Sequence, residues 1–209
     1  MKAKEKFFEI LKEEFSPKLR EIGFKGSGQN FRRIYSPLIH TINIQGNKYG
    51  DSCCVNLGIH LEFLPITWSA SKLPDINKIK GADCEFRKRL APNRDQDYWW
   101  KYKGELLSNT TRSARSLIET YRKYGEPGFQ NFKTVDDVLG MLSVSEIEQE
   151  KYINVFGGVV PVRGALTMAR IYSHVGNVEK SVEFAKLGLK LLGRATALRS
   201  ELERLASAT

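Results

Sequence analysis

The stretch that decides the fold is CCVNLGIHLEFL at residues 53–64, where two kinds of side chain alternate along the chain. The apolar positions are Cys53, Val55, Leu57, Ile59, Leu61 and Phe63, and the positions between them are Cys54, Asn56, Gly58, His60 and Glu62. Successive side chains of a strand point to opposite faces, so this period of two predicts a strand with one core face and one more polar face.

The residues before this stretch repeat the pattern. LIHTINIQ at residues 38–45 places His40, Ile42 and Ile44 on one side, with polar side chains between them. Residues 30–36 also resemble a strand, and residues 83–90 alternate again. Turn-forming residues, Ser36-Pro37 and the segment 46–51, separate the first three segments. We therefore expect an antiparallel meander of three to four strands.

Helical periodicity flanks the predicted sheet. Residues 4–22 have apolar side chains at three- and four-residue spacing. Pro17 interrupts this spacing and either kinks the segment or begins a second short helix that Ser16 could cap. The chain after Gly104 is helical, with a capping pair at Thr134 and Asp137 and a further helix from Ser145 to Phe156. The fold class is thus α+β, with an N-terminal helix, the meander and a helical C-terminal half.

Two arrangements of domains fit this order of elements. In the first, residues 1–125 form an α+β sheet domain and residues 126–209 a helical extension packed on it; in the second, the chain is one continuous domain. Within residues 162–207, small and aromatic residues are spaced as in one tetratricopeptide-type hairpin: Ala169, Tyr172, Gly176, Ala185 and Gly188. A single unit forms no solenoid, so we expect this hairpin to cap or extend the fold.

Composition narrows the class of protein. The 209 residues contain no run approaching the about 18 apolar residues of a membrane span, so we expect a cytoplasmic protein without a membrane partner. Cys53, Cys54 and Cys84 are expected to be reduced thiols, because adjacent strand residues face apart. The net charge of +9 is dispersed along the chain and would attract acidic proteins or phosphate-rich partners.

Motifs for the common chemistries are missing from the sequence. The glycines of GFKGSGQ, residues 23–29, lead from a helix into a strand and lack the Lys-Ser or Lys-Thr pair of a phosphate-binding loop. The three histidines show no metal-ligand spacing. Cys54 and His60 are six strand residues apart, roughly 20 Å, too far for a nucleophile and its base. We expect no catalytic residues, metal or cofactor.

Two groups of residues remain as candidate contacts with a partner. The first is the polar sheet face with Asn43, Gln45 and Asn56. This face is either a recognition surface or a structural face that is exposed to solvent or covered by a helix. The second is the basic and aromatic segment 84–103. Its candidate residues are Arg87, Arg89, Arg94, Trp99 and Trp100. Arginine beside aromatic residues suits protein interfaces and unpaired bases, while the alternative places one Trp ring in the core and the other over the sheet edge.

The order of several short motifs resembles a known family. Gly23-Phe24-Lys25, Asn30-Phe31-Arg32-Arg33, Ile42-Asn43-Ile44-Gln45 and Val55-Asn56-Leu57-Gly58 follow the first helix, and residues 84–90 precede Trp99-Trp100. Over about residues 5–103 this pattern resembles the bacterial domain-of-unknown-function 4304 family. The resemblance implies a shared pattern, without an established activity, at Phe31, Gln45, Asn56, Gly58, Arg87 and Trp99.

Three hypotheses for the function follow. The first is a non-enzymatic protein-binding module, by analogy with bacterial immunity proteins and antitoxins, whose partner is another protein. The second is a single-stranded nucleic-acid-binding protein. The third is an enzyme with a site dispersed on the polar sheet face.

Overall fold

The computed structural model describes residues 2–67, 69, 71–93, 97–102, 107–152 and 156–208. It confirms the α+β fold, with an N-terminal helical segment, an antiparallel sheet and a helical C-terminal half. The strands of the sheet are β1 (Lys25–Ser27), β2 (Asn30–Tyr35), β3 (Leu38–Gly46), β4 (Ser52–Leu61), β5 (Phe86–Arg89) and β6 (Trp100–Lys101).

The predicted meander is the centre of a larger sheet. Strands β1 to β5 lie in chain order and pair antiparallel, while β6 pairs with β4 where Cys53 lies opposite Trp100. The four predicted segments correspond to β2, β3, β4 and β5. The sequence did not predict β1 and β6, because two or three residues are too few to show an alternating pattern.

The alternation along β4 assigns its two faces as expected. Cys53, Val55, Leu57, Ile59 and Leu61 belong to the main hydrophobic cluster, and Phe63 packs against that cluster. Cys54 points to the other face, so the adjacent thiols do not face each other, and all three cysteines are free and buried.

The N-terminal helical segment changes its winding before Pro17. It consists of α1 (Ala3–Ile10), a π-helical turn η1 (Leu11–Phe15) and α2 (Ser16–Glu21). Proline has no N–H for a helical hydrogen bond, and the wider turn accommodates it. The Ser16 hydroxyl donates to the Leu11 carbonyl oxygen at 3.2 Å instead of capping α2.

The same arrangement recurs after the sheet. Helix α3 (Leu107–Thr120) is followed by the π-helical turn η3 (Tyr121–Gly125) and by α4 (Glu126–Gln130), which carries Pro127 in its first turn. The residue boundary 125/126 between the two expected domains therefore falls inside one continuous helical segment.

Short helices and a three-helix group complete the chain. They are η2 (Gly81–Asp83), α5 (Val135–Leu139), α6 (Val144–Gln149), α7 (Pro161–His174), α8 (Val178–Lys190), η4 (Thr196–Leu198) and α9 (Arg199–Ala206). The Thr134–Asp137 capping pair precedes α5 as expected. Helix α6 differs from the expectation: Ser143 caps it, and it ends before Glu150, whose φ is +53°.

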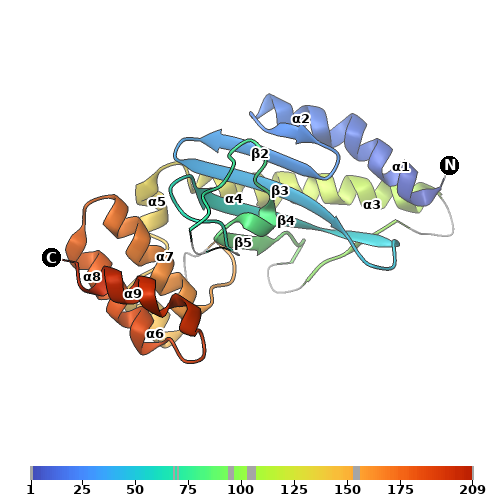
Figure 1. Ribbon diagram of the computed structural model, residues 1–209. Helices are drawn as coiled ribbons and strands as arrows, with labels where there is room; N and C mark the ends of the chain where they lie inside the picture. The colour runs from blue at the N-terminus through green and yellow to red at the C-terminus, as the bar shows by residue number, and fades with distance from the viewer. Residues whose placement is uncertain are drawn as a thin grey trace.

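A third helix, α9, packs against the C-terminal hairpin of α7 and α8. The rings of Tyr172 in α7 and Phe184 in α8 stack at 5.4 Å, and Gly188 of α8 lies against Leu202 of α9. Figure 1 shows α5 to α9 gathered at one end of the sheet, on the left, while α1 to α3 run along the strands. The hairpin thus extends the fold as part of a three-helix group.

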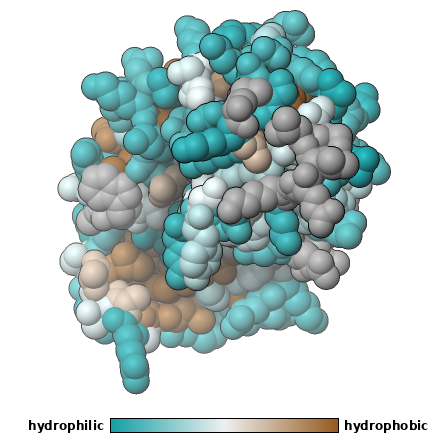
Figure 2. Space-filling model, turned by 90° about the vertical axis from the view of Figure 1, so that its right-hand side faces the viewer, coloured by the Kyte–Doolittle hydropathy of each residue, from teal (hydrophilic) through white to brown (hydrophobic). Residues whose placement is uncertain are grey.

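One hydrophobic cluster joins these parts. It extends from Phe7 of α1 through the sheet and α3 to Leu205 of α9. Hydrophilic side chains predominate on the face of the molecule that Figure 2 shows. No described helix is long and apolar enough to cross a membrane.

Candidate binding site

A row of polar side chains crosses the sheet from β2 to β5. Strand register places Asn30 beside Asn43, Asn43 beside Asn56, and Asn56 beside Arg89. Each donates to the next: Arg89 Nε to Asn56 Oδ1 at 3.4 Å, Asn56 Nδ2 to Asn43 Oδ1 at 3.1 Å, and Asn43 Nδ2 to Asn30 Oδ1 at 2.9 Å. We call these four residues the amide row. Asn56 Nδ2 also donates to Gln45 Oε1 at 2.9 Å, which confirms the expected neighbours on this face.

The segment between β4 and β5 covers the other half of the polar face. A Cβ on Gly58 would lie 2.5 Å from Thr41 Oγ1 and 2.8 Å from Cys84 Sγ, so only glycine admits this close approach. Thr41 and Cys84 are buried and hydrogen-bonded to each other at 3.2 Å. The polar face is therefore covered at Thr41 and open at the amide row.

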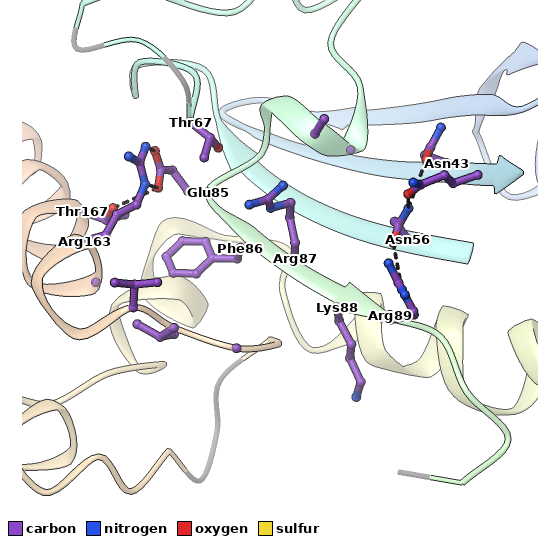
Figure 3. Close-up of a pocket in the computed structure, with 17 residues that line it drawn as sticks. Asn43, Asn56, Thr67, Glu85, Phe86, Arg87, Lys88, Arg89, Arg163 and Thr167 are labelled. Atoms are coloured by element: carbon purple, nitrogen blue, oxygen red, sulfur yellow. Dashed lines mark hydrogen bonds and ion pairs between the residues drawn. The ribbon is translucent and has the colours of Figure 1, made fainter. Parts of the chain in front are cut away.

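The open half adjoins a cleft of about 420 Å³ between the sheet and the start of α7. Figure 3 shows Arg87 between the amide row and an ion pair at the far wall, with Phe86 and Lys88 on the opposite side of β5. The cleft is lined by Asn43, Gln45, Asn56, Thr67, Gly81, Ala82, Glu85, Phe86, Arg87, Lys88, Arg89, Gly158, Val159, Val160, Arg163, Gly164 and Thr167. Four of these side chains are cationic and one is a carboxylate.

The carboxylate is already engaged. Glu85, whose side chain is 3% exposed, accepts from Arg163 at 2.7 and 3.1 Å and from the Thr167 hydroxyl at 3.2 Å. Arg163 and Thr167 lie one turn apart on α7, so both reach Glu85 from the same side. This ion pair closes one end of the cleft and joins α7 to β5.

The arginines of β5 differ in their partners. Arg89 donates to the exposed carboxylate of Asp97 at 2.6 Å, and its guanidinium lies 5.3 Å from the centre of the Trp99 ring. Arg87 is exposed, and its side chain has no hydrogen bond or ion pair with any residue that the structure describes. Lys88 is also exposed without a described ion pair, but it lies on the opposite side of β5, so Arg87 is the available cation on the side of the amide row.

The first turn of α7 adds to this positive character. Gly164 N–H donates to the Val160 carbonyl at 2.8 Å, and the N–H groups before it have no partner within the helix. The N-terminal end of a helix carries a partial positive charge. The cleft therefore favours an anionic group beside Arg87.

The two histidines of the sheet have structural roles. His40 stacks on Phe129 at 4.6 Å, and its ring nitrogens bond to Arg33 and to the Phe132 carbonyl. Burial, with Arg33 beside it, lowers the pKa of His40 to about 4. On the other face, His60 accepts from the Glu85 N–H and bonds to the Leu64 carbonyl, and burial lowers its pKa. Both rings are neutral at pH 7, with both nitrogens occupied.

The three cysteine thiols are also in an unreactive state. Burial raises the pKa of Cys53 and of Cys84 to about 12, and it also raises the pKa of Cys54. A nucleophilic cysteine requires a thiolate, hence a lowered pKa. Among the described residues, no group of three or more His, Cys, Asp or Glu side chains is arranged to hold a metal ion.

The structure brings five of the eight predicted contact residues together in the cleft. These are Asn43, Gln45, Asn56, Arg87 and Arg89. Trp100 is only 1% exposed and belongs to the core, so its ring is not on the contact surface; Trp99 is half-buried beside Arg89. Arg94 lies outside the described residues.

Sequence reasoning missed Glu85, Arg163 and Thr167. Glu85 lies in the alternating segment before β5 and could have been placed on the polar face from its parity with Arg87 and Arg89. Arg163 carries no local signal, because it meets Glu85 from a position 78 residues further along the chain.

The comparison with protein families gave one match. The profile described as a domain of unknown function (DUF4304) matches residues 15–131, which include the amide row and Arg87 but not α5 to α9. Neither the curated proteins nor the solved structures gave a match. Because the family match covers more than half of the 209 residues, the chain belongs to the DUF4304 family.

Proposed function

We propose that this protein is a non-enzymatic binding module that holds an acidic segment of another protein in the cleft between β5 and α7. The observation that carries the proposal is the exposed guanidinium of Arg87, unpaired among the described residues, in a cleft where the one carboxylate is already bound to Arg163. By analogy, such a module would act like a bacterial immunity protein or antitoxin in the cytoplasm.

The surroundings of Arg87 suit a protein ligand. Amide groups of Asn43, Gln45 and Asn56 offer hydrogen bonds to a peptide backbone, and Val160 at the rim is 64% exposed. Arginine beside apolar surface is typical of the residues that dominate protein interfaces. A carboxylate of the partner at Arg87 would gain a charge-assisted hydrogen bond.

The state of the histidines and cysteines supports binding over catalysis. His40 and His60 use both ring nitrogens, and the thiols have raised pKa values. General acid–base and nucleophilic catalysis need side chains with accessible, lowered or near-neutral pKa values. The free thiols also suit a reducing compartment.

The test uses affinity capture with two matched baits. Wild-type protein should retain a stoichiometric partner under mild salt, and Arg87→Glu should lose it, because the new carboxylate repels the acidic segment. Arg20→Glu makes the same charge change at an exposed residue of α2, away from the cleft, and should retain the partner.

Quantitative binding then separates the outcomes. Loss of a charge-assisted hydrogen bond of about 1.5 kcal/mol in Arg87→Ala should weaken affinity about tenfold by isothermal calorimetry. Cross-linking should place an Asp- or Glu-rich segment of the partner at the cleft. A partner that binds Arg87→Glu as tightly as wild type, or the absence of any stoichiometric partner for the folded bait, would refute the proposal.

A further inference from the structure

A second surface lies on the outer side of α3 and its continuation into η3. The inner side of this segment is buried through Ala114, Leu117, Ile118 and Tyr121. The outward residues recur at three- and four-residue spacing and therefore share one face. They are Asn109, Arg112, Ser113, Ser116, Lys123 and Tyr124, while Thr120 in the same row is buried.

Two neighbouring hollows follow this face. One, of about 450 Å³, is bordered by Tyr98, Trp99 and Lys101 from the β6 side, and the other, of about 600 Å³, by Pro92 and Asn93. Ser116 lines both, so the hollows are neighbours along the helix. We call the surface that holds the two hollows the α3 groove.

The α3 groove is basic. Lys101, Arg112 and Lys123 are exposed, and none forms an ion pair with a residue that the structure describes. The acidic side chain of the lining, Glu119, is bound to Arg122 at 2.7 Å. Among the described residues of this surface, three cations therefore have no ion pair and the carboxylate of Glu119 is neutralised.

Aromatic rings stand at both ends of the groove. Tyr98 is 38% exposed and meets the buried Trp100 edge to face at 4.8 Å, while Trp99 is half-buried beside Arg89. At the other end Tyr124 is half-buried, with the Lys123 ammonium 5.1 Å from its ring centre. The core supports the first ring, so it is held in place before any ligand arrives.

We infer that the α3 groove binds single-stranded nucleic acid, at a site separate from the proposed protein-binding cleft. Cations that follow a phosphate backbone, together with aromatic rings on which bases stack, are the two parts of sequence-tolerant recognition of single strands. From Asn109 to Tyr124 the helix rises about 22 Å, room for about four nucleotides of an extended strand.

The aromatic rings at the two ends of the groove favour a single strand over a duplex. In a double helix the base faces are stacked on each other, and Tyr98, Trp99 and Tyr124 would find only backbone. A single strand exposes those faces at the two ends of the groove, while its phosphates pass Arg112 and Lys123. The arrangement therefore favours an unpaired strand.

The test measures fluorescence anisotropy of labelled oligothymidylate and of a duplex of equal length. The single strand should bind at low salt and at least about tenfold more tightly than the duplex. Release of counterions from three phosphates predicts that a roughly fourfold rise in salt weakens binding about 18-fold. Binding that is absent at low salt, or equal for the duplex, would overturn the inference.

Variants locate the site. Arg112→Glu should weaken binding at least tenfold, whereas Arg20→Glu, the same charge change on α2, should stay within about twofold of wild type. Tyr98→Ala should weaken binding because a stacking interaction is lost, and the salt dependence should stay unchanged. Its control is Tyr49→Ala, since Tyr49 lies in the β3–β4 turn and is 76% exposed.

Comparison with the cleft keeps the two proposals apart. Arg87→Glu should leave oligothymidylate binding within about twofold of wild type, and Arg112→Glu should still capture the protein partner. If Arg112→Glu binds the oligonucleotide like wild type, or if Arg87→Glu alone abolishes binding, the α3 groove is not the nucleic-acid site.

Discussion

Arg33 of β2 lies inside the protein, with only 3% of its side chain exposed. Its guanidinium donates to the Ile22 carbonyl at 3.0 Å and to Glu126 at 2.8 Å, and it lies 4.4 Å from the ring centre of Phe24. It also donates to Nδ1 of His40 at 3.2 Å, so the other nitrogen of His40 donates to Phe132. A buried cation is tolerated because these partners replace water. Single residues thus connect β2 and β3 to α4.

The neutral state of His40 predicts how stability depends on pH. Its folded pKa of about 4 lies below the ordinary value of 6.5, so the unfolded chain binds the proton more tightly. The stabilisation is complete above pH 6.5 and is lost as pH falls from there to 4. Denaturant titrations should show the free energy of unfolding falling by about 2 kcal/mol between pH 7 and pH 5.

Two variants test whether His40 causes this pH dependence. His40→Gln should have a smaller loss between the two pH values, and the remaining slope reports groups such as His60, whose pKa shifts in the same direction. His40→Asn removes the same titrating ring and should show the same smaller loss. A slope that His40→Gln leaves unaltered would contradict the assignment.

At the scale of elements, the sheet depends on the close approach of β3, β4 and the segment before β5. Gly58→Ala would place a methyl group 2.5 Å from Thr41 Oγ1 and 2.8 Å from Cys84 Sγ. Because both neighbours are buried, we expect the free energy of unfolding to fall by about 2 kcal/mol. Thermal and denaturant unfolding measure the change.

The matched control is Gly158→Ala. No heavy atom lies within 4 Å of a Cβ at Gly158, so this substitution should change stability by less than about 0.5 kcal/mol. Equal stability of Gly58→Ala and Gly158→Ala would show that the segment before β5 moves away without cost.

Patterns within one element were predictable from the sequence, and contacts between distant elements were not. The period of two along β4 assigned Asn56 and Leu57 to their correct faces, since burial acts on every second residue. The predicted helix from Ser145 to Phe156 was wrong mainly at its end, because Glu150 adopts a left-handed conformation with φ of +53° that ends α6 and that its residue type does not signal. Its start differs less, since Ser143 and not Ser145 caps the helix through the Glu146 N–H. Trp100 enters the core through β6, a strand too short to detect.

At the scale of the whole molecule, the sheet and the C-terminal helices share one hydrophobic cluster. The buried pair of Glu85 and Arg163 joins them at the cleft. Five residues that line the cleft were among the candidates predicted from local patterns. Its far wall was not predicted, because that wall exists only where α7 meets the sheet. Local sequence therefore indicates the side chains of the site and not its shape.

The shared core predicts a single unfolding transition. Calorimetry should give equal calorimetric and van 't Hoff enthalpies for the wild-type protein. Arg163→Met leaves the Glu85 carboxylate buried without its cation and should lower the free energy of unfolding by about 3 kcal/mol.

A double variant distinguishes the lost pair from lost packing. Glu85→Gln combined with Arg163→Met removes both charges and should be less destabilised than Arg163→Met alone. If the double variant is the less stable of the two, or if α7 to α9 melt in a separate transition, the ion pair does not couple the two parts.

The 78 residues between Glu85 and Arg163 also set the timing of events during protein synthesis. At the ordinary speed of translation, Arg163 is added roughly 4 to 16 s after Glu85. During this interval the nascent chain carries Glu85, the residue before β5, without its cation, and the far wall of the cleft does not yet exist. A partner that recognises the whole cleft would therefore find it on the growing chain only after α7 has been made.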